Sequence, residues 1–263
     1  MAIEAFSATH SPFKKPKILV LEVRSRLEPS GKPMAWLVVE RIETSVLDPV
    51  DGAIDNAAIR IRYHQVTPRP RDGVRRTAEF QASFNRAWNT TCLTSHYGGS
   101  GAVFLDLPGL EGNRIGSYMM NEIVSWASRW PDASVKPIQL LSLQAQAENK
   151  DRRNRFYEQF NIRFVYTDLS KSEGLSLPMT AGDLTPSSTW EANIREVNML
   201  EFITSQMAAT ETAAWRIEDL ERGMARLLSE RQRTNQNNRS LVSLACIFLA
   251  GCLLTFWAMR WFH

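Results

Sequence analysis

Two glycines at the start of a predicted helix are the residues best placed to hold a charged ligand. Gly112 and Gly116 follow the apolar segment 102–107, which predicts a strand, and precede residues with helical spacing. The first amides of a helix lack acceptors within the helix, and the helix dipole adds partial positive charge at the same end. Glycine lets the backbone approach a ligand closely. The pattern predicts an anion-binding turn.

The helix after this turn is indicated by large apolar residues at steps of three and four, and Pro131 ends it. A strand over 138–143 and a helix over 150–160 follow. This order of strand, turn, helix, strand and helix is common in α/β proteins and does not by itself identify a nucleotide-binding protein. The apolar positions of the first helix are Ile115, Met119, Ile123, Trp126 and Trp130.

Residues 112–120 and 154–164 together resemble two segments of the GCN5-related N-acetyltransferase family. That family binds acetyl-CoA on a turn of the form Gln/Arg-x-x-Gly-x-Gly/Ala and places a tyrosine, often within Phe-Tyr-Glu, near the departing sulfur. The resemblance covers roughly residues 100–167. It implies a mixed sheet flanked by helices, with the family's splayed strand pair at Leu105 and Leu141.

The resemblance also implies roles for individual residues. Main-chain groups of Asp106 and Leu107 would pair with the pantetheine arm, and Tyr157 would be the general acid. A buried core tyrosine is the alternative for Tyr157. Glu111 stands where the family has Gln or Arg, and Arg114 replaces its first glycine. The residues expected to hold the pyrophosphate are Gly112, Asn113, Arg114, Ile115, Gly116 and Ser117.

The function expected from this resemblance is a membrane-tethered N-acetyltransferase that moves an acetyl group from acetyl-CoA to an amine of a small molecule or protein. The alternative is a catalytically inactive protein of the same fold, acting as a membrane-anchored interaction or assembly module. Glu79, His96 and Asp106 are candidate bases, but none lies at a diagnostic spacing. The four histidines are scattered, so no metal is expected.

A run of nineteen uncharged residues at 241–259 predicts a transmembrane helix, since as a helix it spans about 28 Å. A buried core helix is the alternative. The upstream side carries Arg231, Arg233 and Arg239, whereas Arg260 alone follows the run. This asymmetry predicts a single-pass membrane protein with its N-terminal domain in the cytoplasm, anchored by residues 240–263.

Residues 190–233 are expected to form one or two helices within a linker or coiled-coil stalk at 186–239. They either fold back on the domain or associate with a second copy of the chain, which would make a homo-oligomer. Heptad spacing is best over Ile217, Leu220, Met224 and Leu227.

The first 185 residues are expected to form one acetyltransferase-like domain of the α+β class. Segments 17–26 and 35–44 predict an antiparallel hairpin, and 57–66 predicts a third strand. Residues 74–91 predict a helix, because Phe80, Phe84, Ala87 and Trp88 mark one helical face.

The composition fits one core of ordinary size, with 44% hydrophobic and 22% charged residues. The formal net charge of +3 is small, so nucleic acid is not an expected partner. The arginine-rich segment 60–76 is expected to be a strand end and solvated loop; lipid, CoA phosphates and nucleic acid are its alternative contacts. Three cysteines, two of them in the uncharged run, do not indicate a disulfide framework.

Overall fold

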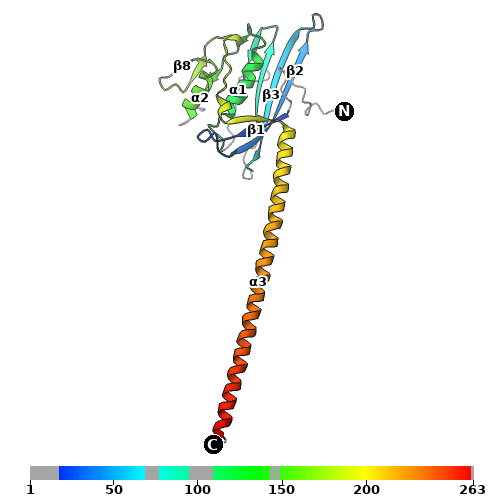
Figure 1. Cartoon of the computed structure of the whole chain (residues 1–263). Helices are drawn as coiled ribbons and strands as arrows, with labels where there is room; N and C mark the ends of the chain where they lie inside the picture. The colour runs from blue at the N-terminus through cyan, green and yellow to red at the C-terminus, as the bar shows by residue number, and fades with distance from the viewer. Residues whose placement is uncertain (1–17, 69–76, 95–108, 143–144, 146–148, 262–263) are drawn as a thin grey trace. The chain divides into compact units, whose positions relative to one another are not determined.

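The chain divides into two compact units, Met1–Phe202 and Ile203–His263. The structure is a computed structural model, and it describes residues 18–68, 77–94, 109–142, 145 and 149–261 (Figure 1). On the long C-terminal helix, side chains are described for residues 199–233 and 242–251.

The first unit contains a larger sheet with the strand order β10-β1-β2-β3-β4-β5-β6. All neighbouring strands are antiparallel except β5 and β6, which are parallel. The predicted hairpin and third strand are confirmed as β1, β2 and β3. The strands are β1 (Ile18–Val23), β2 (Ala35–Leu47), β3 (Ile54–Thr67), β4 (Thr77–Asn85), β5 (Thr90–Cys92), β6 (Ser134–Val135) and β10 (Ile194–Val197).

Alternating burial along the central strands gives the larger sheet one apolar face. In β4, Ala78, Phe80, Ala82 and Phe84 are buried, while the residues between them are more exposed. This alternation is the strand period, since successive side chains point to opposite faces. The predicted helix over 74–91 is therefore wrong for 77–85 and for 90–91, because the four-residue spacing of Phe80 and Phe84 also fits a period of two.

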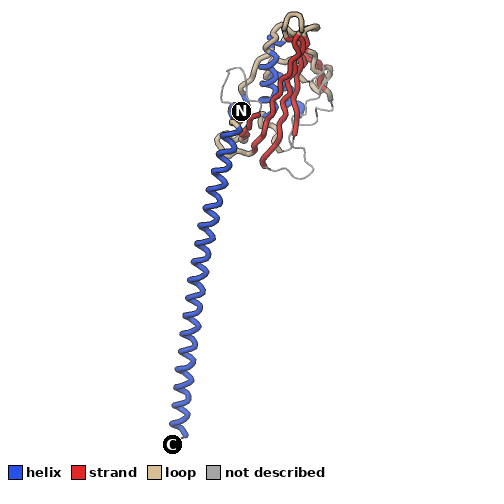
Figure 2. Tube along the Cα trace, turned by 90° about the vertical axis from the view of Figure 1, so that its right-hand side faces the viewer, coloured by secondary structure: helices blue, strands red, loops and turns tan. Residues whose placement is uncertain are grey.

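Helix α1 (Ile115–Ala127) covers this apolar face by packing on β3 and β4 (Figures 1 and 2). Trp126 is 1% exposed and contacts Trp130 edge-on. The Trp130 ring stacks on that of Phe84 with centroids 4.2 Å apart. The helix predicted from the spacing of apolar residues is confirmed, and its wide apolar stripe anchors it on the sheet.

A smaller sheet with the order β7-β9-β8 packs with helix α2 (Asn149–Glu158), which confirms the helix expected at 150–160. The Arg153 guanidinium joins them by donating to the carbonyl of Leu141, at 2.9 Å, and to that of Ser172, at 2.8 Å. The strands are β7 (Gln139–Leu140), β8 (Phe164–Tyr166) and β9 (Gly174–Ser176), so the strand predicted over 138–143 is shorter than expected.

The two sheets part at Pro137. The amide of Lys136 donates to the carbonyl of Thr91 in the larger sheet, at 2.8 Å. Two residues later, the carbonyl of Ile138 accepts from the amide of Ser176 in the smaller sheet, at 3.0 Å. The segment that carries β9 also pairs with residues before Pro137, because the amide of Val135 donates to the carbonyl of Met179, at 2.9 Å, and Ser134 forms a bridge with Thr180. The pairing with β5 therefore ends at Lys136, while the pairing with 174–180 continues on both sides of Pro137, which has no amide hydrogen.

Strand β10 lies in the stretch 190–233 that was predicted to be helical. Residues 189–192 form a short 3-10 helix and Ile194–Val197 pair with β1, so the helical prediction is wrong before Met199. The β1 residue Glu22 is 2% exposed and forms ion pairs with Arg24, at 2.6 Å, and Arg195, at 2.8 Å. Burial opposes ionisation of Glu22, but the hydrogen bonds from these arginines prevail and lower its pKa.

Helix α3 (Met199–Trp261) is a single element of 63 residues. Across the described residues, no helix has a stretch that is both long and apolar enough to cross a membrane, so the transmembrane span predicted at 241–259 is wrong. The predicted single-pass location with a cytoplasmic domain is wrong for the same reason.

Replacing Trp126 by Ala should destabilise the first unit by about 3–5 kcal/mol, because a buried indole leaves a large cavity. The matched variant is Trp88→Ala, since Trp88 is 80% exposed. Its stability should change by no more than about 0.5 kcal/mol. Urea unfolding of the full chain, followed by near-UV circular dichroism, measures both. Equal losses in the two variants would contradict the packing of α1 described above.

Candidate functional site

The turn before α1 has several residues with positive φ angles and leads directly into the first helical amides. Gly109, Gly112 and Arg114 have positive φ angles of 84°, 76° and 64°. The first helical hydrogen bond joins the amide of Tyr118 to the carbonyl of Arg114, at 3.0 Å. Within the described residues, the amides of 115–117 donate to no protein group, and no side chain caps the helix. Partial positive charge therefore collects at this end.

Two asparagines hold this turn in place. The Asn113 side-chain oxygen accepts from the amide of Arg26, at 3.1 Å. The side-chain amide of Asn193, 3% exposed, donates to the carbonyls of Asn113 and Arg24, both at 3.0 Å. The Arg24 amide in turn donates to the carbonyl of Asn193, at 2.8 Å. The end of β1, the turn and the start of β10 are thus joined at one buried side chain.

The charged residues of the turn already have protein partners. The Glu111 carboxylate accepts from the amide of Gly109, at 2.8 Å. The Arg114 guanidinium donates to the side-chain oxygen of Asn193, at 3.3 Å. Glu111 therefore accepts from one amide of the turn and brings negative charge to it, while the amides of 115–117 have no acceptor in the part of the chain that the structure describes.

Ser117 has a structural partner as well. Its hydroxyl, on a residue that is 8% exposed, accepts from the side-chain amide of Gln159, at 2.9 Å. The oxygen of that Gln159 amide accepts from the hydroxyl of Thr189, at 3.0 Å. Gln159 thereby connects the first turn of α1 to the end of α2, which leaves the main chain of Ser117 as its group available to a ligand.

Tyr157 is a largely buried residue of α2. Its ring contacts those of Phe156 and Phe164, with centroids 5.0 and 5.3 Å apart. Burial raises the pKa of Tyr157 to about 12, although nearby Arg153 acts in the opposite direction. The phenol therefore keeps its proton throughout the neutral range, as a proton donor requires, but it is a weak acid. Both roles considered for Tyr157, general acid and core residue, stay predictions.

The remaining predicted residues do not gather at this turn. Asp106, Leu107, Leu105 and His96 lie outside the described residues. Glu79 projects from β4 and its carboxylate pairs with Arg62 of β3, at 2.6 Å. Glu79 alternates with the buried Phe80, so it lies on the face of the sheet away from α1.

No protein-family model, curated protein or solved structure matches this chain. The case for a site therefore depends on the geometry alone. Among the residues that the structure describes, no group of histidine, cysteine, aspartate and glutamate side chains could hold a metal ion.

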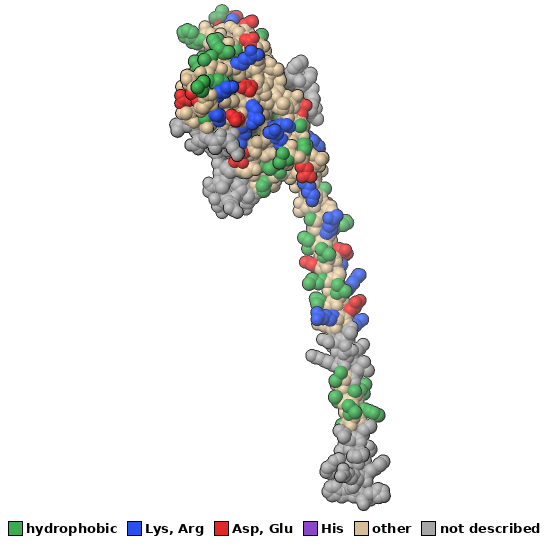
Figure 3. All heavy atoms as spheres, turned by 90° about the vertical axis from the view of Figure 1, so that its left-hand side faces the viewer, with side chains coloured by type: hydrophobic (Ala, Val, Ile, Leu, Met, Phe, Trp, Pro, Cys, Tyr) green, Lys and Arg blue, Asp and Glu red, His purple; other side chains and the backbone are tan. Residues whose placement is uncertain are grey.

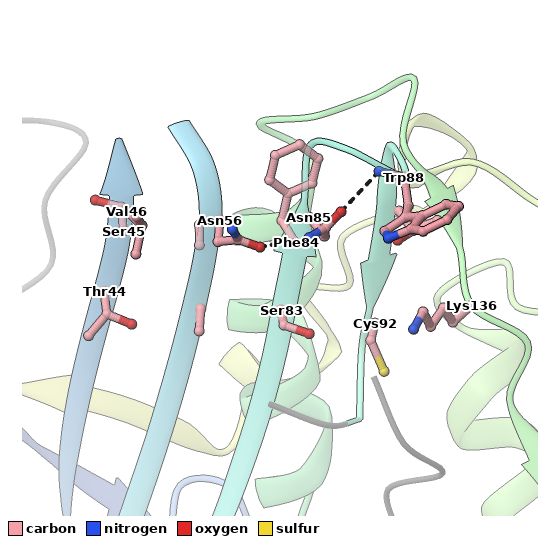
Figure 4. A pocket seen from close by; sticks show the side chains of 13 residues that line it. Thr44, Ser45, Val46, Asn56, Ser83, Phe84, Asn85, Trp88, Cys92 and Lys136 are labelled. Carbon is pink, nitrogen blue, oxygen red and sulfur yellow. Dashed lines mark hydrogen bonds between the residues drawn. The ribbon is translucent and has the colours of Figure 1, made fainter. Parts of the chain in front are cut away.

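A separate cavity of about 700 Å³ opens on the side of the larger sheet away from α1 (Figure 4). It lies near the C-terminal end of α1, where Trp130 stacks on Phe84, and so about 20 Å from the first turn. None of the predicted site residues lines it. Its described lining is mostly hydroxyl, amide and apolar, with the exposed Trp88 and with Lys136 as its single charged residue.

Asn193 and Gln159 are the two site residues that the sequence analysis missed. Both act through side-chain amides, and their partners lie 80 and 42 residues away in the sequence. Asparagine and glutamine have no periodicity that marks such contacts. The one local sign for Asn193 is its position directly before the alternating Ile194–Val197 segment.

Replacing Asn193 by Ala should destabilise the protein by about 1–3 kcal/mol, since it leaves the carbonyls of Arg24 and Asn113 without their donor. Amide hydrogen exchange should accelerate at 112–118 and remain unchanged in α2. The companion variant Asn193→Asp retains the acceptor for Arg114 but loses both donated bonds, so it should behave like Asn193→Ala. A fully stable Asn193→Asp variant would show that the Arg114 contact holds the turn instead.

Proposed function

We propose that this protein binds acetyl-CoA at the first turn of α1 and transfers the acetyl group to an amine. The observation that carries the proposal is the uncapped start of α1, where the amides of 115–117 have no acceptor within the described residues. Backbone amides at a helix start suit a diphosphate, because several donors and the helix dipole point at one place. We identify the anion as the diphosphate of acetyl-CoA from the resemblance to the GCN5-related N-acetyltransferases.

The separation of the sheets at Pro137 supports the same proposal. Helix α1 connects two parallel strands, β5 and β6, and the chain then turns into β7 of the other sheet. In the family that the sequence resembles, the acyl arm lies where two such strands splay apart. The Leu141 side of that predicted pair follows β7 directly.

The proposed reaction needs positioning more than covalent chemistry. The amine nitrogen attacks the thioester carbon, so a C–N bond forms and the C–S bond breaks. The ammonium proton leaves to a base or to water, and the departing thiolate takes a proton from Tyr157. The first turn of α1 holds the diphosphate in place while the acetyl group moves from the thioester sulfur to the amine nitrogen.

Two observations favour a second function, an interaction module of the same fold without catalysis. Glu111 places a carboxylate on the turn, where it opposes a bound diphosphate. Tyr157 is packed among aromatic rings, and its pKa of about 12 makes it a weak proton donor at neutral pH. The two functions differ in whether acetyl-CoA binds and is consumed.

Acetyl-CoA should raise the melting temperature of the full-length protein, because a ligand that binds the folded state at 100 times its Kd adds about 2.7 kcal/mol. Gly112→Asp should abolish the shift, since it adds a negative charge to the turn. Gly112→Asn is the matched control. It has the same shape without the charge, and both side chains tolerate the positive φ of Gly112.

CoA should therefore stabilise the wild-type protein and Gly112→Asn, whereas pantetheine, which lacks the diphosphate, should have little effect. Absence of a shift with millimolar acetyl-CoA in the wild-type protein contradicts the proposal and leaves the interaction module. A shift that survives Gly112→Asp places the ligand elsewhere.

If Tyr157 is the acid, Tyr157→Phe should lower kcat by about 10²–10⁴ and leave the KM for acetyl-CoA nearly unchanged. The protonated phenol is the active form, and it predominates below a pKa of about 12, so Tyr157 should cause no fall in kcat between pH 7 and 10. Thiol release with a panel of primary amines measures the rate. Tyr166→Phe is the control; unchanged turnover in both variants would assign Tyr157 to the core.

A further inference from the structure

Helix α3 exposes a row of large apolar side chains along part of its length. Ile217, Leu220, Met224 and Leu227 have exposed fractions of 57%, 73%, 65% and 68%. Figure 3 shows apolar and charged side chains alternating around this part of the helix. A helix that is exposed to solvent on every side carries charged or polar residues on all its faces. A contiguous row of exposed apolar side chains therefore indicates a binding partner.

The four residues are spaced three, four and three apart, which is the heptad pattern of a coiled coil. Ile217 and Met224 take the a positions, and Leu220 and Leu227 take the d positions. The ion pair between Glu218 and Arg222 lies at b and f, on the outer surface. The row therefore forms a seam, defined here as these four a and d residues, on one side of the helix.

The residues of the seam favour two strands over three or four. A β-branched residue at a with leucine at d is the arrangement preferred in parallel dimers, and Ile217 with Leu220 has it.

Charges beside the seam favour a second copy of this chain in parallel register. Arg216 is at g and Glu221 at the following e position. In a parallel, in-register dimer, each g residue faces the e residue five positions later on the other helix, so Arg216 faces Glu221 of the second copy, and the pair occurs twice. An antiparallel dimer would instead place e positions beside e positions and g positions beside g positions, so Arg216 and Glu221 would not meet.

We infer that α3 is a self-association element in which the 217–227 seam forms a parallel, in-register, two-stranded coiled coil with a second copy of the chain. This assigns a partner and a register to the homo-oligomer expected from the sequence. It does not depend on the proposed catalytic function.

The test is sedimentation equilibrium of the full-length protein. The wild-type chain should be a dimer, and Leu220→Glu and Leu227→Glu should each weaken it by at least about 100-fold in Kd, because they place a charge in the seam. Ala225→Glu is the matched control. It makes the same kind of change on the same helix at an outer b position, and it should leave the dimer intact.

Register is tested separately. Arg216→Glu and Glu221→Arg should each weaken the dimer by opposing like charges, and the double variant should restore it. With Cys246 and Cys252 replaced by Ser, Leu220→Cys should crosslink to itself between copies and Ala225→Cys should not. A monomeric wild-type chain, a trimer or tetramer, or failure of Leu220→Cys to crosslink within the dimer would overturn the inference.

Discussion

The geometry of the candidate site depends on one buried side chain, that of Asn193. Its side-chain amide donates to carbonyls in the β1–β2 connection and in the turn before α1, and the main-chain carbonyl of Asn193 accepts from the amide of Arg24. These three segments are far apart in the sequence. Because a buried carbonyl without a donor is costly, loss of this one side chain removes the hydrogen-bond partners of two segments at once. The left-handed turn at Gly112 and Arg114 is held in place by these distant contacts.

The break at Pro137 has a similar organising effect on the sheets. Residues on both sides of Pro137 pair with the segment 174–180, but the pairing with β5 stops at Lys136. Proline has no amide hydrogen to extend that second ladder, so β5 and β7 are not joined across it. Arg153 then fixes α2 to the smaller sheet through main-chain carbonyls, and the separation is maintained by contacts from several elements.

How far the sequence predicted the fold depended on the periodicity of each segment. The apolar residues of α1 repeat at three and four and those of β3 at two, while β1 and β2 are apolar segments on either side of a turn rich in Pro and Gly, so these elements were predicted correctly. The spacing of Phe80 and Phe84 fits both a helix and a strand. The segment forms a strand because Ala78 and Ala82, at a spacing of two, complete the same buried face. Strand β10 was missed because four residues next to a long helix give too little pattern.

The site was predictable only in its local part. Glycines before an amphipathic helix indicated the open amides of α1, but Asn193 and Gln159 act across long separations that no local pattern encodes. The membrane prediction failed differently. Absence of charge does not by itself make a run apolar enough to span a bilayer, and this run contains Ser243 and Gly251.

The two ion pairs of Glu22 give the β1–β10 edge of the sheet an acid-labile character. Because the pKa of Glu22 is lowered in the folded state, its contribution to stability is complete above the ordinary carboxyl pKa of 4.5 and is lost as the pH falls through the lowered value. Protonation uncouples Arg24 and Arg195 in one event and leaves two cations facing each other across neighbouring strands. Strongly acidic solution should therefore destabilise the β1–β10 edge of the sheet, and with it the strand that leads into α3. The aromatic residues packed beneath α1 should be affected only later.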